Sequence, residues 1–292
     1  MQAVVFYLVY PVLYLVASLP FGALYKLSDF FYLVLRLSGY RRGVVVENLR
    51  NSFPEKTDQE IAELADKYFR YLCDLILETL KTLTMDEKEA RARCTFHGIE
   101  MIDALYQKKQ SFIIAMGHIG NWEWAGPSFS LNNKHQLVVI YRPLSNPYFE
   151  KMMVGMRTRW GTMITPVSQT LRDMVSKRKM VTATALIADQ SAFGDLGYWT
   201  TFLHQDTVVF TGPEKLAIKF NYPIVFLYMR RPKRGYYEVF AEMLIEEPTK
   251  TVENQISEAF IKRLEKEILV DPTIWLWSHR RWKYKRSDYT QA

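Results

Sequence analysis

At 292 residues the chain can bury a substantial core, either as one large domain or as a domain with an anchor. It contains 38 Lys and Arg against 31 Asp and Glu, and the net charge of +7 suits nucleic acid, an anionic membrane or an acidic partner. No zinc-finger, RNA-recognition or helix-turn-helix signature is present, so we expect no nucleic-acid partner. Cys73 and Cys94 have no metal or redox spacing, which fits packing residues in a reducing compartment.

The first 25 residues contain no Asp, Glu, Lys or Arg. As one helix this run would be about 37 Å long, enough to cross a bilayer core, although Pro11 and Pro20 leave kinked, tilted or re-entrant paths open. No basic segment precedes it and no small-residue cleavage site ends it, which argues against a signal peptide. By the positive-inside rule, its basic C-terminal flank places the body of the protein in the cytoplasm; that flank holds Lys26, Arg36, Arg41 and Arg42.

We therefore expect residues 1–40 to form a membrane-anchoring segment, with a buried or interfacial helix over 27–40, and residues 41–292 to form the remaining domain. The alternative is an N-terminal helix docked into the core. Residues 57–60 (Thr-Asp-Gln-Glu) match a capping box and begin a scaffold helix.

From residue 93 onward, apolar runs alternate with helical segments, which predicts an α/β sandwich with a mixed sheet flanked by helices. We expect strands at 111–116, 137–141, 181–187, 223–230 and 236–244. Helices are expected at 99–109, 121–132, 146–160, 168–178, 212–220 and 252–269.

The most informative stretch begins with the apolar run 112–116, which reads as a buried strand. Gly117 and Gly120 indicate a tight turn after this strand. Asn121 is a good N-cap for a helix that begins near residue 122. The chain thus passes from a strand through a turn into a capped helix, an arrangement that presents the turn residues to a site.

His118 lies in this turn, and Glu123 lies five residues later in the first helical turn. With His118 outside the helix, the carboxylate can fold back toward the imidazole and form a dyad that frees the other ring nitrogen to take a proton. Backbone N–H groups at Gly117 and Gly120 would stabilise a developing oxyanion. A hydrogen-bonded structural histidine is the alternative that the motif leaves open.

Other polar residues follow the predicted strands. Arg142, Arg157 and Arg159 lie at loop-to-helix positions that can hold phosphates through forked hydrogen bonds, or they line a solvated helix face. Asp189 and Gln190 end a strand, where they either orient a substrate or form a structural turn.

Two further candidates lie in the C-terminal third. Gly212 begins a helix whose N–H groups face either a phosphate or a pantetheine arm, or simply form a capped turn. The tail 275–286 mixes aromatic and basic residues, including His279 and Arg280. Such mixing suits a membrane interface and equally suits a surface that binds single-stranded nucleic acid.

The residues from Gly117 to Glu123 resemble the H-x4-D/E signature of the bacterial lipid A biosynthesis (lauroyl/myristoyl) acyltransferase family. Further short matches follow in family order along nearly the whole chain. They are Glu47-Asn48-Leu49 with Ser52-Phe53-Pro54, His97-Gly98-Ile99-Glu100, Tyr141-Arg142-Pro143 with Asn146-Pro147, Ala188-Asp189-Gln190, Thr211-Gly212 with Leu216-Ala217, and residues 275–283.

The resemblance implies an acyltransferase at the bacterial inner membrane, with its catalytic domain facing the cytoplasm. It implies acyl carrier protein as donor, with coenzyme A left open, and a lipid A precursor as acceptor. Basic residues matching Arg157 and Arg159 are implied in acceptor phosphate binding and catalysis, and His279 and Arg280 in substrate or membrane contact. We expect no metal and no cofactor beyond the acyl co-substrate.

In the expected mechanism, His118 deprotonates the acceptor hydroxyl while Glu123 holds and polarises the imidazole. The alkoxide then attacks the thioester directly, without a serine or cysteine nucleophile. The alternatives are another acceptor (a glycerophospholipid, glycolipid or aminolipid), a non-catalytic membrane lipid-binding protein, or an esterase that uses water. The segment 191–201 is longer and more aromatic than the family pattern, and we expect Trp199, Phe202 and His204 to shape the acyl channel.

Overall fold

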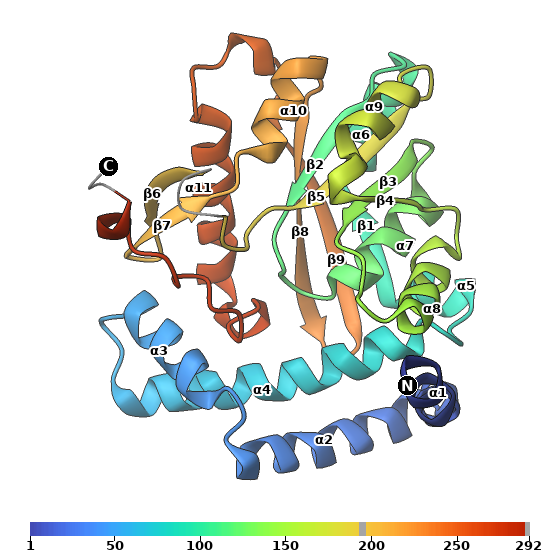
Figure 1. The fold of residues 1–292 in the computed structure, drawn as a ribbon, viewed down its shortest axis with the longest axis vertical. Helices are drawn as coiled ribbons and strands as arrows, with labels where there is room; N and C mark the ends of the chain where they lie inside the picture. Colours follow the sequence, from blue (N-terminus) through green and yellow to red (C-terminus); the bar gives the residue numbers. More distant parts are fainter. Residues whose placement is uncertain (193–196, 290–292) are drawn as a thin grey trace.

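The computed structural model describes residues 1–192 and 197–289. A seven-stranded sheet with the order β1-β9-β8-β2-β5-β3-β4 forms the centre, and helices cover both of its faces (Figure 1). This confirms the predicted α/β fold with a mixed sheet. The strands are β1 (Cys94–His97), β2 (Phe112–Met116), β3 (Gln136–Tyr141), β4 (Met163–Pro166), β5 (Thr182–Ile187), β8 (Ile224–Lys233) and β9 (Tyr236–Ile245).

Helices before and between the strands complete the fold. They are α1 (Gln2–Ser18), α2 (Phe21–Ser38), α3 (Arg42–Ser52), α4 (Asp58–Lys81), α5 (Glu87–Arg93), α6 (Ile99–Gln107), α7 (Trp122–Asn132), α8 (Pro147–Thr158), α9 (Thr170–Ser176), α10 (Gly212–Phe220) and α11 (Gln255–Val270). The capping box predicted at Thr57 is present at the start of α4.

The sequence prediction missed three short pieces of β structure. The strands β1 and β4 have only four residues each and lie at the two edges of the sheet, so neither carries a continuous apolar run. A separate antiparallel hairpin, β6 (Tyr198–Phe202) and β7 (Gln205–Val209), follows the segment 193–196, which lies outside the described residues. Phe202 and His204 belong to this hairpin. Phe202 is fully buried against Trp275 rather than lining a channel, and His204 is in the exposed turn.

The central strand β2 supplies both layers of the core because successive strand residues point to opposite faces. Ile113 and Ala115 pack in the cluster that contains α11, whereas Phe112 and Ile114 pack in the cluster that contains α7. The uninterrupted apolar character of this strand therefore reflects burial on both sides.

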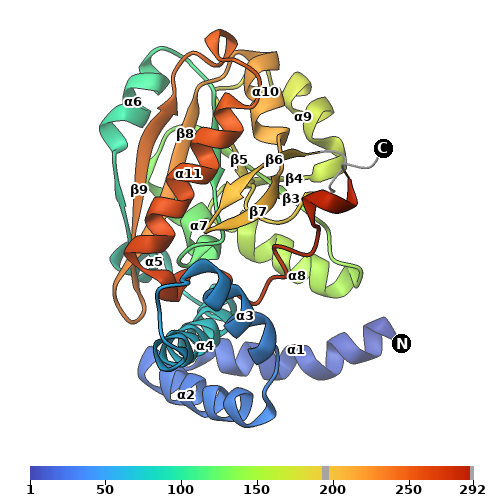
Figure 2. The same ribbon diagram turned by 90° about the vertical axis from the view of Figure 1, so that its left-hand side faces the viewer.

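The chain leaves β2 and β5 in opposite directions. From β2 it passes through α7 to β3 on one side, and from β5 it passes through the β6–β7 hairpin and α10 to β8 on the other. Figures 1 and 2 show α7 and α10 on opposite faces of the sheet. Such a change of direction opens a crevice at the carboxyl ends of the strands, where α/β folds place their ligands.

The N-terminal apolar run, whose path the sequence left open because of Pro11 and Pro20, is not one continuous helix. It divides into α1 and α2 at Pro20, whose backbone is extended and cannot continue the preceding helix. At 17 residues, α1 is about 25 Å long, shorter than the roughly 30 Å of a bilayer core. Within the described part of the chain, no helix is both long and apolar enough to cross a membrane.

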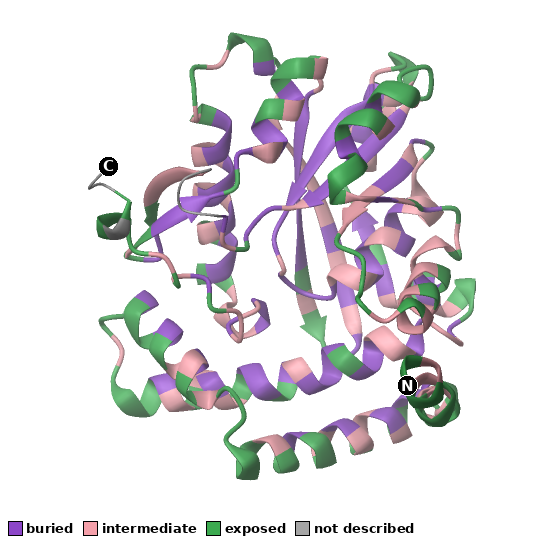
Figure 3. Ribbon diagram, viewed as in Figure 1, coloured by how far each residue is buried: buried purple, intermediate pink, exposed green. Residues whose placement is uncertain are grey.

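Both N-terminal helices nevertheless expose many of their residues (Figure 3), and many of the exposed side chains are apolar. Among them, four residues of α1 recur at the spacing of one helical face and form an apolar stripe, and four residues near the C-terminal end of α2 form a second stripe. They are Val4, Leu8, Val12 and Leu15 on α1, and Phe30, Leu33, Val34 and Leu37 on α2.

A buried polar network ties these helices to the sheet. The Glu78 carboxylate on α4 accepts hydrogen bonds from Tyr25 on α2, from Asn121 before α7 and from Tyr237 on β9. Glu78 is fully buried, and burial raises the pKa of its carboxyl. A buried group of this kind is tolerated only because its hydrogen-bond partners are supplied.

We predict that Glu78→Ala lowers the free energy of unfolding by about 3 kcal/mol, because it leaves three buried donors without an acceptor. The exposed Glu63 on the same helix is a matched control, and Glu63→Ala should change stability by less than about 0.5 kcal/mol. Chemical denaturation in detergent measures both values. Equal stability of the two variants would contradict the role given to this network.

Candidate active site

The centre of the site is a histidine–aspartate pair at the carboxyl ends of two neighbouring parallel strands. His118 follows β2 and Asp189 follows β5, which β2 pairs with directly. The Nδ1 atom of His118 lies 2.6 Å from Oδ1 of Asp189, and the backbone N–H of His118 donates to Oδ2 over 2.7 Å. The carboxylate therefore holds both the ring and the backbone of the histidine.

Asp189 accepts a further hydrogen bond from the indole N–H of Trp275, over 2.8 Å. Burial by itself would raise the pKa of this carboxyl. The charge of His118, with the hydrogen bonds from His118 and Trp275, instead lowers the pKa of Asp189 to about 2. The carboxylate is consequently ionised at neutral pH although only 2% of its side chain is exposed.

The ionised partner fixes how the imidazole can act. A proton on Nδ1 is stabilised by Asp189, which leaves the lone pair of Nε2 available as a base. The Nε2 atom faces a pocket, where the side-chain amide nitrogen of Gln190 lies 3.4 Å away. The ring also packs edge-on against Trp122, with the ring centroids 4.9 Å apart.

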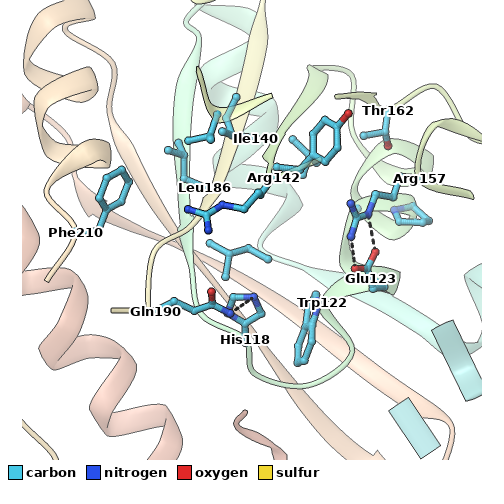
Figure 4. Close-up of a pocket in the computed structure, with 16 residues that line it drawn as sticks. His118, Trp122, Glu123, Ile140, Arg142, Arg157, Thr162, Leu186, Gln190 and Phe210 are labelled. Carbon is cyan, nitrogen blue, oxygen red and sulfur yellow. Dashed lines mark hydrogen bonds and ion pairs between the residues drawn. The ribbon is translucent and has the colours of Figure 1, made fainter. Parts of the chain in front are cut away.

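The structure corrects the predicted partner of His118. Glu123 does not contact the imidazole; it binds Arg157 on α8 in a bidentate ion pair, over 2.9 and 2.6 Å. The helix α7 begins at Trp122, so its first turn directs Glu123 toward α8, while Asp189 already occupies the space beside His118. Glu123 remains a pocket residue, next to but separate from the His118–Asp189 pair (Figure 4).

The pocket has a volume of about 310 Å³ and combines a polar mouth with apolar walls. Arg142, exposed after β3, and Arg157 supply positive charge, and the Glu123 carboxylate supports the latter. Burial opposes the charge on Arg157, but its ion pair with Glu123 raises its pKa above the ordinary value. The walls come from several elements and include Val139, Ile140, Leu186, Ile187 and Phe210.

Three predicted binding residues have structural roles instead. The Asn121 side chain caps α7 as predicted, but it is fully buried and donates to Glu78, so it does not reach the pocket. Arg159 ends α8 and donates to the carbonyl of Thr82. Of the two arginines that the sequence could not separate, Arg157 therefore lines the pocket. Gly212 begins α10 beneath the ring of Phe210 and is likewise outside the pocket lining.

Both turn glycines allow close packing, and the part predicted for the backbone N–H of Gly117 at an oxyanion stays a prediction. A Cβ on Gly117 would lie 2.7 Å from Leu264 and 3.2 Å from the Asp189 carboxylate, so glycine lets the turn approach its anion. Gly120 has φ +63°, and its N–H donates to the carbonyl of Ile274. The N–H of Gly120 already donates a hydrogen bond within the protein and is not available to an oxyanion, which corrects its predicted role.

Residues 275–283, which we call the C-terminal block, support the His118–Asp189 pair but do not line the pocket. Burial lowers the pKa of His279 to about 4, although the nearby Asp189 charge opposes this. Arg280 is exposed and lines a different cleft. The sequence analysis missed two residues here, namely Trp275 as a donor to Asp189 and the buried Arg281. The aromatic-basic pattern of residues 275–286 and the family match over residues 275–283 were their signals, and neither assigned a role to these two residues.

Known proteins resemble this chain over most of its length. The family model for bacterial lipid A biosynthesis acyltransferase matches residues 1–284. The chain is also similar to the lipid A biosynthesis lauroyltransferase of Escherichia coli (strain K12), with 24% identity over 282 residues. That alignment covers 93% of this chain and 89% of the relative. The similarity therefore extends over the N-terminal helices, the sheet and the C-terminal block.

We predict that Asp189→Asn lowers kcat about 10³- to 10⁴-fold in an acyl-transfer assay, because an amide no longer stabilises the protonated imidazole. Glu123→Gln should act through Arg157 instead. The double variant with Arg157→Gln should then be little worse than either single variant, whereas the losses from Glu123→Gln and Asp189→Asn should multiply.

Circular dichroism of each variant controls for folding. If the effects of Glu123→Gln and Asp189→Asn failed to multiply, Glu123 would act through His118 after all, as the sequence first suggested.

Proposed function

Because this chain belongs to the bacterial lipid A biosynthesis acyltransferase family, we propose that it moves a fatty acyl chain from a thioester donor to a hydroxyl group of a lipid A precursor. The observation that carries the proposal is the His118–Asp189 pair, whose Nε2 faces a pocket with two arginines and apolar walls. The acyl donor is acyl carrier protein or coenzyme A.

The first step is general base catalysis. Nε2 of His118 takes the proton of the acceptor hydroxyl while Asp189 stabilises the imidazolium. The alkoxide attacks the thioester carbonyl, and a tetrahedral intermediate forms. Its collapse breaks the carbon–sulfur bond, and the leaving thiolate takes the proton back from His118. The acyl group thus passes directly from donor to acceptor, and no covalent acyl-enzyme is formed.

The oxyanion of the intermediate needs a hydrogen-bond donor near His118. The backbone N–H of His118 already donates to Asp189, and the backbone N–H of Gly120 donates to the carbonyl of Ile274. Our candidates for this role are therefore the backbone N–H of Gly117 and the exposed side-chain amide of Gln190, which lies 3.4 Å from Nε2.

The arginines of the pocket suit a phosphorylated acceptor. Arg142 is exposed, and no ion pair within the described residues involves it, so its guanidinium is available for a phosphate. Arg157 is held in one orientation by Glu123, which supports its use as a fixed contact. Both features agree with a lipid A precursor. Another anionic membrane lipid would make the same contacts.

The same proposal places the protein at the inner membrane, with the active site facing the cytoplasm. The apolar stripes of α1 and α2 suit helices that lie in the interface, with their exposed side chains among the acyl chains. In addition, α1 packs against α8, where Phe6 stacks on Tyr148, and α8 carries Arg157. A membrane-embedded α1 would therefore hold the pocket close to its lipid substrate.

The test is an acyl-transfer assay with the purified protein in detergent, labelled acyl carrier protein and a lipid A precursor. We expect labelled lipid product from the wild type and a loss of about 10³-fold or more in His118→Ala. His204→Ala, at an exposed hairpin turn, is the matched control and should keep full activity.

Other outcomes would redirect the proposal. Product from His118→Ala at the wild-type rate would place the base elsewhere. Transfer to a glycerophospholipid or glycolipid but not to the lipid A precursor would change the acceptor. Release of free fatty acid without any lipid acceptor would indicate a thioesterase. Lipid binding without turnover would indicate a binding protein.

We predict that the double variant Leu8→Asp/Leu15→Asp weakens binding to anionic vesicles at least tenfold, because both side chains leave the apolar stripe of α1. Leu269→Asp, which changes an exposed leucine on α11, is the control and should leave binding unchanged. Vesicle co-sedimentation measures the difference. Equal binding of all three proteins would exclude α1 as the membrane contact.

A further inference from the structure

A second cleft, of about 870 Å³, shares no lining residue with the active-site pocket. It lies between α3, the turn that leads into β7 and residues 280–287. Figure 1 shows these three segments on the α11 side of the sheet, away from α7 and α8. We call it the basic cleft, and its lining includes Asn51, Gln205, Arg280, Lys283 and Lys285.

The basic cleft carries a surplus of positive charge. Its lining includes four basic residues against two carboxylates, those of Glu47 and Asp206. Arg280, Lys283 and Lys285 are exposed, and none of them forms an ion pair with a carboxylate in residues 1–192 and 197–289. The asparagine and glutamine amides of the lining can both donate and accept hydrogen bonds. Such a surface suits an anionic ligand with amide groups.

The cleft connects to the catalytic histidine through a short stretch of chain. Arg280 is in its lining, and the Ser191 hydroxyl donates to the backbone carbonyls of Arg280 and Arg281. Gln190, the preceding residue, lies beside Nε2 of His118. Gln190 and Ser191 therefore connect the lining of the basic cleft to the catalytic histidine.

Arg281 adds fixed positive charge between the cleft and the active site. Only 2% of it is exposed, and no nitrogen of its guanidinium has a hydrogen-bond partner among the described residues. Burying a cation without a partner is costly, so most arginines in such a position are paired. The neighbouring residue Arg280 faces the cleft. The charge of Arg281 is close enough to that of Asp189 for the two to interact.

A direct transfer requires both substrates at once, one on each side of His118. The pocket with Arg142 and Arg157 suits the acceptor, so the donor needs another approach. We propose that the basic cleft binds the phosphate-bearing pantetheine arm of the thioester donor, through Arg280, Lys283 and Lys285, and leads the thioester toward His118. This inference rests on the proposed function and adds a donor site to it.

The test compares the double variant Lys283→Glu/Lys285→Glu with the wild type. Three donors with the same acyl chain are used: acyl carrier protein, coenzyme A and N-acetylcysteamine, which has no phosphate. We expect KM to rise at least tenfold for the first two donors and to stay unchanged for the third. The kcat and the KM for the lipid acceptor should not change. The matched control is Lys215→Glu/Lys219→Glu on α10, with the same change in charge.

An equal rise in KM for the N-acetylcysteamine thioester, or no rise for any donor, would overturn the proposal. A rise for acyl carrier protein alone would also overturn it, since the cleft would then bind an acidic protein surface rather than the phosphate arm.

Calorimetric binding of coenzyme A separates this inference from the proposed function because it needs no turnover. Wild-type binding that weakens at least tenfold in the cleft variant, but not in the α10 control, would support the donor site even if lipid A were not the acceptor. Absence of binding to the wild type would count against the cleft even if acyl transfer occurred.

Discussion

The buried carboxylate of Asp189 is the group around which the site is built. It sits where β2 and β5 end side by side, and three hydrogen bonds from His118 and Trp275 keep it ionised in spite of burial. The donors come from two distant parts of the fold, the turn after β2 and the C-terminal block, so a correct site requires that the sheet and the C-terminal block are both in place. Glycine is required at position 117 beside this carboxylate, because any side chain there would collide with Leu264 and crowd the carboxylate.

Local patterns in the sequence predicted much of this arrangement. The apolar run before His118, the cap at Asn121 and the alternation of strands and helices depend on neighbouring residues, and all three are present. The partner of His118 could not be found in this way, since Asp189 is 71 residues further on and meets it only through strand pairing. Glu123 was the nearest carboxylate in the sequence, but the direction of the first turn of α7 gives it to Arg157.

The remaining differences have the same origin. A charge-free run of 25 residues is typical of a spanning helix, yet the extended backbone at Pro20 divides it, and tertiary packing on α4 decides where α2 lies. Arg157 and Arg159 are two positions apart at the end of α8. Their side chains point in different directions, so Arg157 lines the pocket while Arg159 donates to the carbonyl of Thr82. The contact of Trp275 with Asp189 and the burial of Arg281 likewise depend on which residues surround them once the chain is folded.

The attachment of α2 has a consequence for anyone who wishes to shorten this enzyme to obtain it without detergent. Ser28 donates to the buried Asp74, Tyr25 donates to Glu78, and the amine of Lys81 reaches carbonyls at the end of α1. Deleting the first 40 residues would therefore remove more than exposed apolar surface. It would expose Asp74 and Glu78 of α4 and remove one hydrogen-bond donor from each, and Glu78 is the carboxylate that holds Asn121 at the edge of the catalytic turn. Replacing exposed leucines and valines on the outer stripe is the better route to solubility, because those side chains hold nothing else in place.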